Sequence, residues 1–153
     1  MKKVFFLAGI ILSCLLFGCS NEAEKKAIED VLEQDRLQFD TVKAKANHMS
    51  SIDLTKCPLD FRQKYIAHIG AWREFALVEH EAEIWQEKHG SLKGGIAGAI
   101  RVIFGDLRAL SEPFEEQNKL KEHYFTAKKK IKDTWNDVLQ CAAKYGVDTS
   151  KYR

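Results

Sequence analysis

Proline is scarce in this chain of 153 residues, which contains only Pro58 and Pro113. No Pro- or Ser-rich linker divides the sequence, and its length suits one domain with a substantial core rather than two. The apolar run from Val4 to Phe17 is shorter than the roughly 20 residues that a spanning helix needs. We therefore expect one domain and no permanent transmembrane helix in this run.

The sequence also lacks the short motifs of common catalytic sites. It contains no nucleophile elbow, phosphate-binding loop, paired-cysteine zinc motif or H-E-x-x-H motif. Glu-x-x-His, which di-iron bundles require, does not occur either. These absences favour a protein that is not an enzyme and carries no cofactor.

Three side chains are the remaining candidates for chemistry. His68 lies among aromatic residues, where it is either a core histidine with a hydrogen-bond partner or a ligand or base. Glu79 and Glu83 share a helix face at a spacing of four and could bind a cation, or could form a solvated acidic surface. A metal-dependent or enzymatic activity at His68, Glu79 and Glu83 is the alternative to a binding protein.

The start of the chain has the three parts of an export signal: basic Lys2 and Lys3, the apolar run, and Leu16-Phe17-Gly18-Cys19. The last four residues resemble the lipobox of bacterial prolipoproteins. The resemblance implies that residues 1–18 are a removable signal peptide and that residues 19–153 form the mature domain. It also implies that Cys19 is acylated, for example with palmitate, and holds the protein to membrane lipid.

The resemblance further implies a location in the cell envelope. In a bacterium with two membranes the protein would lie on the outer membrane, facing the periplasm. In a bacterium with one membrane it would lie on the outer face of the cytoplasmic membrane. We expect a binding or scaffolding role toward an unknown envelope protein.

Charge gives no argument for a nucleic-acid partner. The chain has 24 Lys and Arg residues against 22 Asp and Glu residues. Lys2 and Lys3 would leave with the signal peptide, and every acidic residue follows Cys19. The mature domain is therefore formally neutral.

Apolar residues recur at helical spacing through the mature domain, and no segment alternates like a strand. They predict long helices over about 22–48, 58–89 and 113–145, and a short Gly-rich helix over 94–110. Ile66, Ile69 and Ala76 are expected to widen the apolar face of the second long helix. We predict an all-α fold with three long antiparallel helices in a bundle and a short Gly-rich cross-helix.

Two cysteines of the mature domain, Cys57 and Cys141, remain after acylation of Cys19. Because the expected compartment is oxidising, we predict a disulfide between them. Such a bond requires antiparallel second and last helices, and its register would place His68 near Ile131.

The expected helix directions also position the protein relative to its anchor. A first helix that leads away from Cys19 would leave the disulfide at the distal end and residues 94–110 near the membrane. In this segment Gly94 and Gly98 would allow close packing, while Ile100 and Phe104 add apolar surface. The segment could pack across the bundle or act directly on the membrane.

Overall fold

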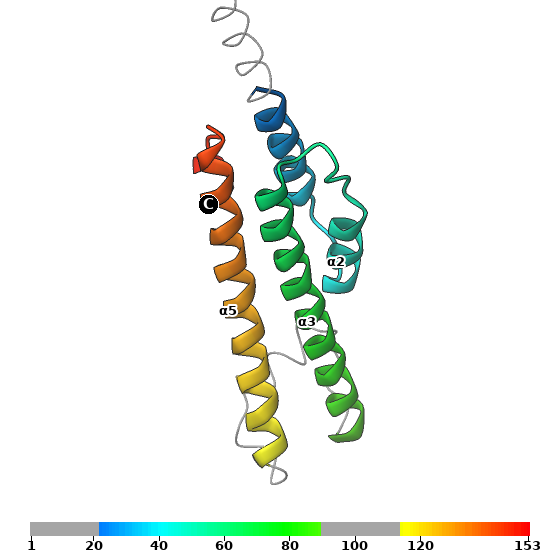
Figure 1. Ribbon diagram of the computed structural model, residues 1–153. Helices are drawn as coiled ribbons and strands as arrows, with labels where there is room; N and C mark the ends of the chain where they lie inside the picture. Colours follow the sequence, from blue (N-terminus) through cyan, green and yellow to red (C-terminus); the bar gives the residue numbers. More distant parts are fainter. Residues whose placement is uncertain (1–21, 90–113) are drawn as a thin grey trace, which may run out of the picture.

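The computed structural model describes residues 22–89 and 114–153. In these ranges the chain is helical and contains no strand, which confirms the all-α class. The elements are a helix over residues 22–35, α2 (Val42–Ser51), α3 (Leu59–His89), α5 (Phe114–Lys144) and the short 3-10 helix η1 (Ser150–Tyr152) (Figure 1).

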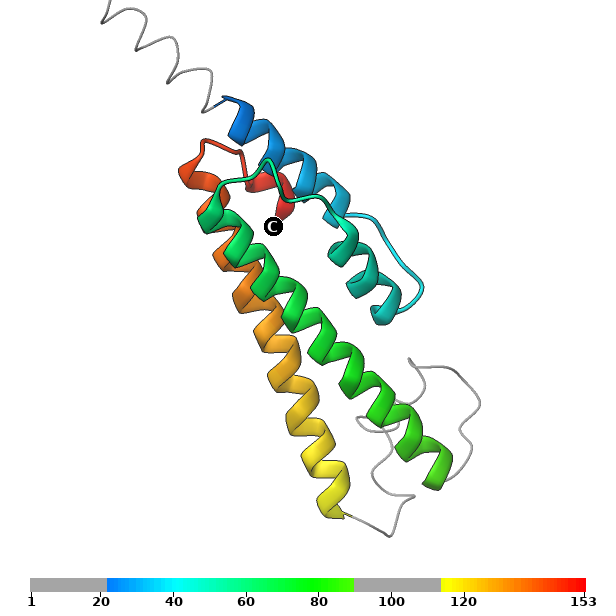
Figure 2. The same cartoon turned by 45° about the vertical axis from the view of Figure 1, so that its right-hand side comes forward.

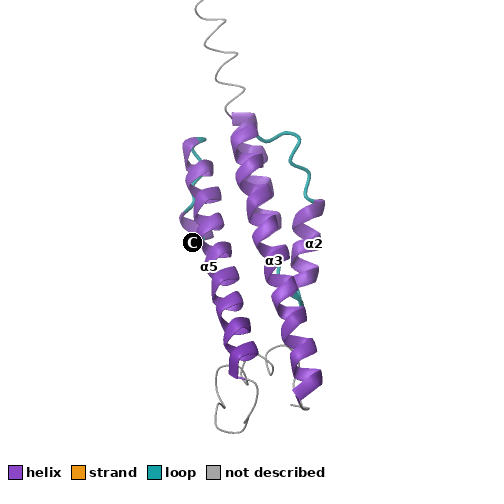
Figure 3. Ribbon diagram, turned by 60° about the horizontal axis from the view of Figure 1, so that its bottom comes forward, coloured by secondary structure: helices purple, strands orange, loops and turns teal. Residues whose placement is uncertain are grey.

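The two longest helices, α3 and α5, lie side by side along the molecule (Figures 1 and 3). They are antiparallel, as predicted, because Lys64 pairs with Asp137 while Glu74, further along α3, pairs with Lys130. The predicted register is wrong by about one turn. His68 hydrogen-bonds Thr134, three residues beyond the expected Ile131.

The predicted first long helix, residues 22–48, is wrong because the chain reverses direction within it. The helix ends at residue 35, and α2 runs back along the molecule after a short connection (Figure 2). Thr41 caps α2 by accepting a hydrogen bond from the Ala44 N–H at 3.1 Å. The described part of the bundle therefore has two long helices and two shorter ones, not three long ones.

This reversal changes which parts of the chain lie near residue 22. The start of α3 and the end of α5 lie at the same end of the molecule as residue 22, while His89 and Phe114 lie at the opposite end (Figure 2). Cys57 and Cys141 therefore lie at the end of the molecule that contains residue 22, not at the opposite end from it. The predicted cross-helix, with Gly94, Gly98, Ile100 and Phe104, lies outside the described residues.

The main core is at the end that contains residue 22. Its fully buried side chains come from all the long elements and include Ile28, Leu32, Met49, Phe61, Tyr65 and Val138. The expected apolar face of α3 is largely confirmed, with the exception of Ile66, which is exposed.

The predicted disulfide is not formed, and Cys57 and Cys141 are buried free thiols. The Cys141 thiol instead donates to Asp60 Oδ2 at 3.4 Å, and the Tyr145 hydroxyl donates to Asp60 Oδ1 at 2.7 Å. Asp60 thus joins the first turn of α3 to the last turns of α5.

The C-terminal residues fasten helix 22–35 to α5. Gly146, with φ +77°, ends α5 as the sequence predicts, and the Val147 N–H bonds back to the Ala142 carbonyl. The chain then turns so that the Tyr152 hydroxyl donates to Glu33 at 2.9 Å, and the Trp135 indole donates to the Tyr152 carbonyl at 3.1 Å.

Candidate functional site

An open groove lies where helix 22–35 ends beside α3 and α5. Its volume is about 700 Å³. We call it the Trp72–Trp135 groove, and it is lined by Asp35, His68, Trp72, Phe125, Lys128, Lys129, Ile131, Lys132 and Trp135.

Aromatic rings form much of the apolar surface of this groove. The His68 ring lies between two indoles, with its centroid 5.0 Å from that of Trp135 and 6.3 Å from that of Trp72. The Trp72 ring meets Phe75 edge to face at 6.4 Å. Phe125 adds a further ring that is 58% exposed. Such surface suits a ligand with a flat or apolar body.

His68 is held by protein partners at both ring nitrogens. The Trp72 indole N–H, which can only donate, bonds to Nε2 at 3.1 Å. Nε2 therefore carries no proton, and the proton on Nδ1 is donated to Thr134 Oγ1 at 2.9 Å. Burial lowers the pKa of His68 to about 4, with the Lys45 charge as a second cause. His68 is a neutral core histidine in this arrangement.

Asp35, which lines the groove, forms a buried ion pair with Lys45. Lys45 Nζ is 3.3 Å from Asp35 Oδ1, and both side chains are almost fully enclosed. The Tyr65 hydroxyl donates to the same carboxylate at 3.0 Å. Burial raises the pKa of Asp35, although Lys45 and Tyr65 both act to lower it. Lys45 also lies over the Trp72 ring, 5.7 Å from its centroid.

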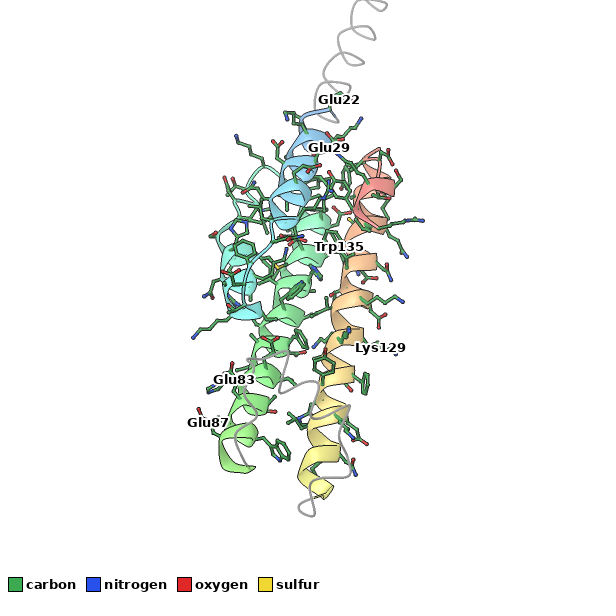
Figure 4. All side chains as sticks on the ribbon, turned by 180° about the vertical axis from the view of Figure 1, so that it is seen from behind. Glu22, Glu29, Glu83, Glu87, Lys129 and Trp135 are labelled. Atoms are coloured by element: carbon green, nitrogen blue, oxygen red, sulfur yellow. The ribbon has the colours of Figure 1, made fainter. Side chains whose placement is uncertain are left out.

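Three lysines of α5 line the groove: Lys128, Lys129 and Lys132. Lys130, by contrast, belongs to the α3 contact, where its ammonium bonds both oxygens of Glu74 at 2.6 and 2.7 Å. Lys129 and Trp135 are labelled on α5 in Figure 4. Within residues 22–89 and 114–153 none of the three groove lysines pairs with a carboxylate. The groove thus combines an apolar lining with uncompensated positive charge.

The sequence-predicted glutamates have a different position. Glu79 and Glu83 line a second groove, between α2 and α3, with a volume of about 490 Å³. Burial, followed by the nearby Glu83, raises the pKa of Glu79. Glu83 lies 3.5 Å from the His80 ring, and it is labelled on α3 in Figure 4.

The structure therefore does not bring His68 together with Glu79 and Glu83. In the described ranges no group of three or more His, Cys, Asp or Glu side chains could hold a metal ion. Asp35 and Lys45 were missed by sequence reasoning. The available signal was Asp35 itself, a charge three residues after Leu32 in an otherwise apolar helix stripe.

The proposed anchor residue, Cys19, also lies outside the described residues. Among the residues that are described, no helix is both long enough and apolar enough to cross a membrane. No protein-family model, curated protein or solved structure matches the chain.

Proposed function

We propose that the chain is a lipid-anchored protein of the bacterial cell envelope that binds a small anionic amphiphile in the Trp72–Trp135 groove. By amphiphile we mean a molecule with a carboxylate or phosphate group and an apolar body. The observation that carries the proposal is the pairing of an aromatic lining with three lysines that have no carboxylate partner.

The anchor is inferred from the lipobox resemblance at Leu16-Phe17-Gly18-Cys19. Helix 22–35 begins three residues after Cys19, so little chain separates the folded body from an acyl group on that residue. Two acyl chains suffice for stable membrane attachment. In a cell with two membranes we place the protein on the outer membrane facing the periplasm, and otherwise on the outer face of the cytoplasmic membrane.

The size and chemistry of the groove support a small ligand. Ligand sites are commonly about 300–1,000 Å³ and mostly apolar, with a few polar groups that orient the ligand. The groove volume of about 700 Å³ falls in this range. Lys128, Lys129 and Lys132 supply positive charge for an anionic group, while Trp72 and Trp135 offer ring surface to its apolar part.

The hydrogen bonds of His68 and Asp35 favour a binding function over catalysis. Both nitrogens of His68 are engaged, by Trp72 and Thr134. The Asp35 carboxylate is held by Lys45 and Tyr65. A general acid or base needs a proton position within reach of the substrate, and in these two groups those positions are occupied by protein partners.

Ligand binding is tested by titrating the purified protein with dodecyl phosphate below its micelle concentration, with dodecyl maltoside as the neutral comparison. Tryptophan fluorescence reports binding because two of the three tryptophans line the groove. We expect saturable binding of the phosphate alone. Lys132→Glu should weaken it about tenfold, while Lys119→Glu, on the same helix outside the groove, should not. Equal binding of the neutral detergent, or no effect of Lys132→Glu, contradicts the proposal.

Anchoring is tested separately in bacteria fed labelled palmitate. The chain should take up label and remain in the membrane fraction, and Cys19→Ser should abolish both. Cys14→Ser changes a cysteine within the signal peptide and serves as the matched control, which should keep the label. Label that persists in Cys19→Ser would refute the anchor.

A further inference from the structure

Four large apolar side chains form an exposed line along the outer face of α3. Leu59, Ile66, Leu77 and Ile84 are 62%, 58%, 65% and 43% exposed. At 100° per residue they lie within roughly 20° of one another around the helix axis. We call them the α3 stripe, which extends over about 38 Å at 1.5 Å per residue.

The α3 stripe is not explained by the bundle. The side chains that α3 buries, such as Phe61, Tyr65 and Phe75, lie on its opposite face. Gly70 falls on the same line as the stripe, and a Cβ atom built on it would meet nothing within 4 Å. The middle of the stripe is therefore a place where another backbone could approach closely. Several large exposed apolar side chains aligned on one helix face can mark a contact surface.

Charges on the two sides of the stripe have opposite signs. Arg62 and Arg73 lie on one flank, and Glu74 and Glu81 lie on the other, while Glu87 lies further round the helix on the arginine side. If two copies of α3 meet in parallel about a two-fold axis along their length, the basic flank of each faces the acidic flank of the other. Arg73 then faces Glu74 of the second copy.

An antiparallel pair would be opposed by the same charges. In an antiparallel pair the two-fold axis is perpendicular to the helices, so the arginine flank of one copy lies against the arginine flank of the other. Arg73 would then lie close to Arg73 of the second copy near the axis. Arg73 bonds Ser50, Glu74 pairs with Lys130 and Glu81 lies 3.7 Å from the His123 ring of its own chain. Arg62 is half-buried, and its Nε atom is enclosed without a hydrogen-bond partner among the described residues. Glu74 is nevertheless half exposed and can be shared with a second cation.

We propose that the α3 stripe is the interface of a parallel homodimer, in which two copies lie side by side with their N-terminal ends together. Leu59, Ile66, Leu77 and Ile84 of one copy pack on the same residues of the other, and Gly70 permits close approach. This arrangement also suits two copies on one membrane, a point that rests on the proposed lipid anchor. Attachment of both copies to the same membrane raises the effective concentration of one copy around the other.

The interface is tested by disulfide crosslinking of the full chain in cells. Ile66→Cys should form a covalent dimer with itself, and so should Leu77→Cys, because a parallel pair places each residue opposite its own copy. Leu37→Cys, with a similarly exposed leucine off the stripe, is the matched control and should remain monomeric. The unsubstituted chain should also remain monomeric, since Cys57 and Cys141 are buried.

The outcomes separate the arrangements. Crosslinks that form only between coexpressed Ile66→Cys and Leu77→Cys chains would indicate an antiparallel pair and overturn the proposal, as would no crosslink at any stripe position. A crosslinked dimer in the soluble fraction would keep the interface while refuting the anchor.

A measurement without cysteine substitution uses the processed protein purified in detergent. Sedimentation over a range of concentrations should show a dimer that Leu77→Glu weakens about a hundredfold, because two copies of the contact are lost. Arg73→Glu should also weaken it, because the new carboxylate would face Glu74 of the second copy. A dimer that survives Leu77→Glu would show that the stripe is not the interface.

Discussion

The indole N–H of Trp72 donates to Nε2 of His68 at 3.1 Å, and this contact fixes the protonation of the histidine. Because an indole can only donate, His68 must carry its proton on Nδ1, where it donates to Thr134 across the α3 and α5 interface. Thr134 in turn donates to the Lys130 carbonyl at 2.7 Å. A chain of hydrogen bonds thus runs from the groove surface to the backbone of α5.

This chain predicts that Thr134→Val destabilises the protein. Valine matches threonine in shape but leaves the His68 Nδ1–H without an acceptor in a buried position, which costs about 1–3 kcal/mol. Chemical denaturation should show this loss in the free energy of unfolding. Thr134→Ser retains the hydroxyl and should recover most of it. A valine variant as stable as the original protein would contradict the hydrogen bond.

The lowered pKa of His68 predicts loss of stability in mild acid. Its folded pKa of about 4 lies below the ordinary value of about 6.5, so the unfolded chain takes up the proton first. The stabilisation is therefore complete above about pH 6.5 and is lost as the pH falls toward 4, by up to about 3 kcal/mol. Asp35 acts in the opposite direction, because its folded pKa is raised.

The contribution of His68 is isolated by comparing the protein with His68→Gln at each pH. The Asp35 effect is common to both proteins and cancels in the difference. The difference in unfolding free energy should be largest above pH 6.5 and should shrink toward pH 4. A difference that is constant over this range would show that His68 does not titrate as the structure indicates.

The buried pair of Lys45 and Asp35 predicts a large effect of removing one partner. Lys45→Met keeps the side-chain length but leaves the Asp35 carboxylate enclosed without its counter-charge, which costs about 3–5 kcal/mol. The double variant Lys45→Met with Asp35→Asn should recover part of the loss. Thermal or denaturant unfolding of the original protein, Lys45→Met, Asp35→Asn and the double variant gives the comparison. Simple addition of the two single losses would argue against direct coupling.

The sequence predicted most of the helical architecture, because helical spacing and helix ends are local properties. The helix predicted to end at residue 145 is followed by Gly146, which ends α5, and on α3 Ile69 is buried as expected. The break after residue 35 was missed because neither glycine nor proline occurs between residues 36 and 41. Its cause is tertiary: the Asp35 carboxylate meets Lys45, which lies beyond the reversal.

The groove was less accessible to sequence reasoning than the helices. His68 was identified as a core histidine or a functional residue, but its partners Trp72 and Thr134 depend on the register of α3 against α5. The predicted register relies on a disulfide that the structure does not contain. It is displaced by about one turn along α5, so that the residue predicted to lie near His68 is not the one that hydrogen-bonds it. In the sequence Lys128, Lys129 and Lys132 form part of a run of charged residues, and their role as groove lining depends on the position of helix 22–35.

The state of the two cysteines predicts how the native protein reacts with a thiol reagent. Burial raises the pKa of Cys57 to about 11, and burial together with the adjacent Asp60 raises that of Cys141. Because only the thiolate reacts, the raised pKa of Cys57 reduces its reactive fraction at pH 8 about a hundredfold, and the raised pKa of Cys141 acts in the same direction. The native chain should therefore react slowly with Ellman's reagent.

Unfolding in denaturant without a reductant should then release two reactive thiols per processed chain, because Cys19 would be acylated and Cys14 removed. Cys141→Ser should release one, which assigns the signals. In the folded protein Asp60→Asn should speed the reaction of Cys141, because the carboxylate that opposes its ionisation is gone. An unfolded chain with no reactive thiol would instead establish the Cys57–Cys141 disulfide. The first turn of α3 and the last turns of α5 would then have to approach one another without the hydrogen bond from Cys141 to Asp60.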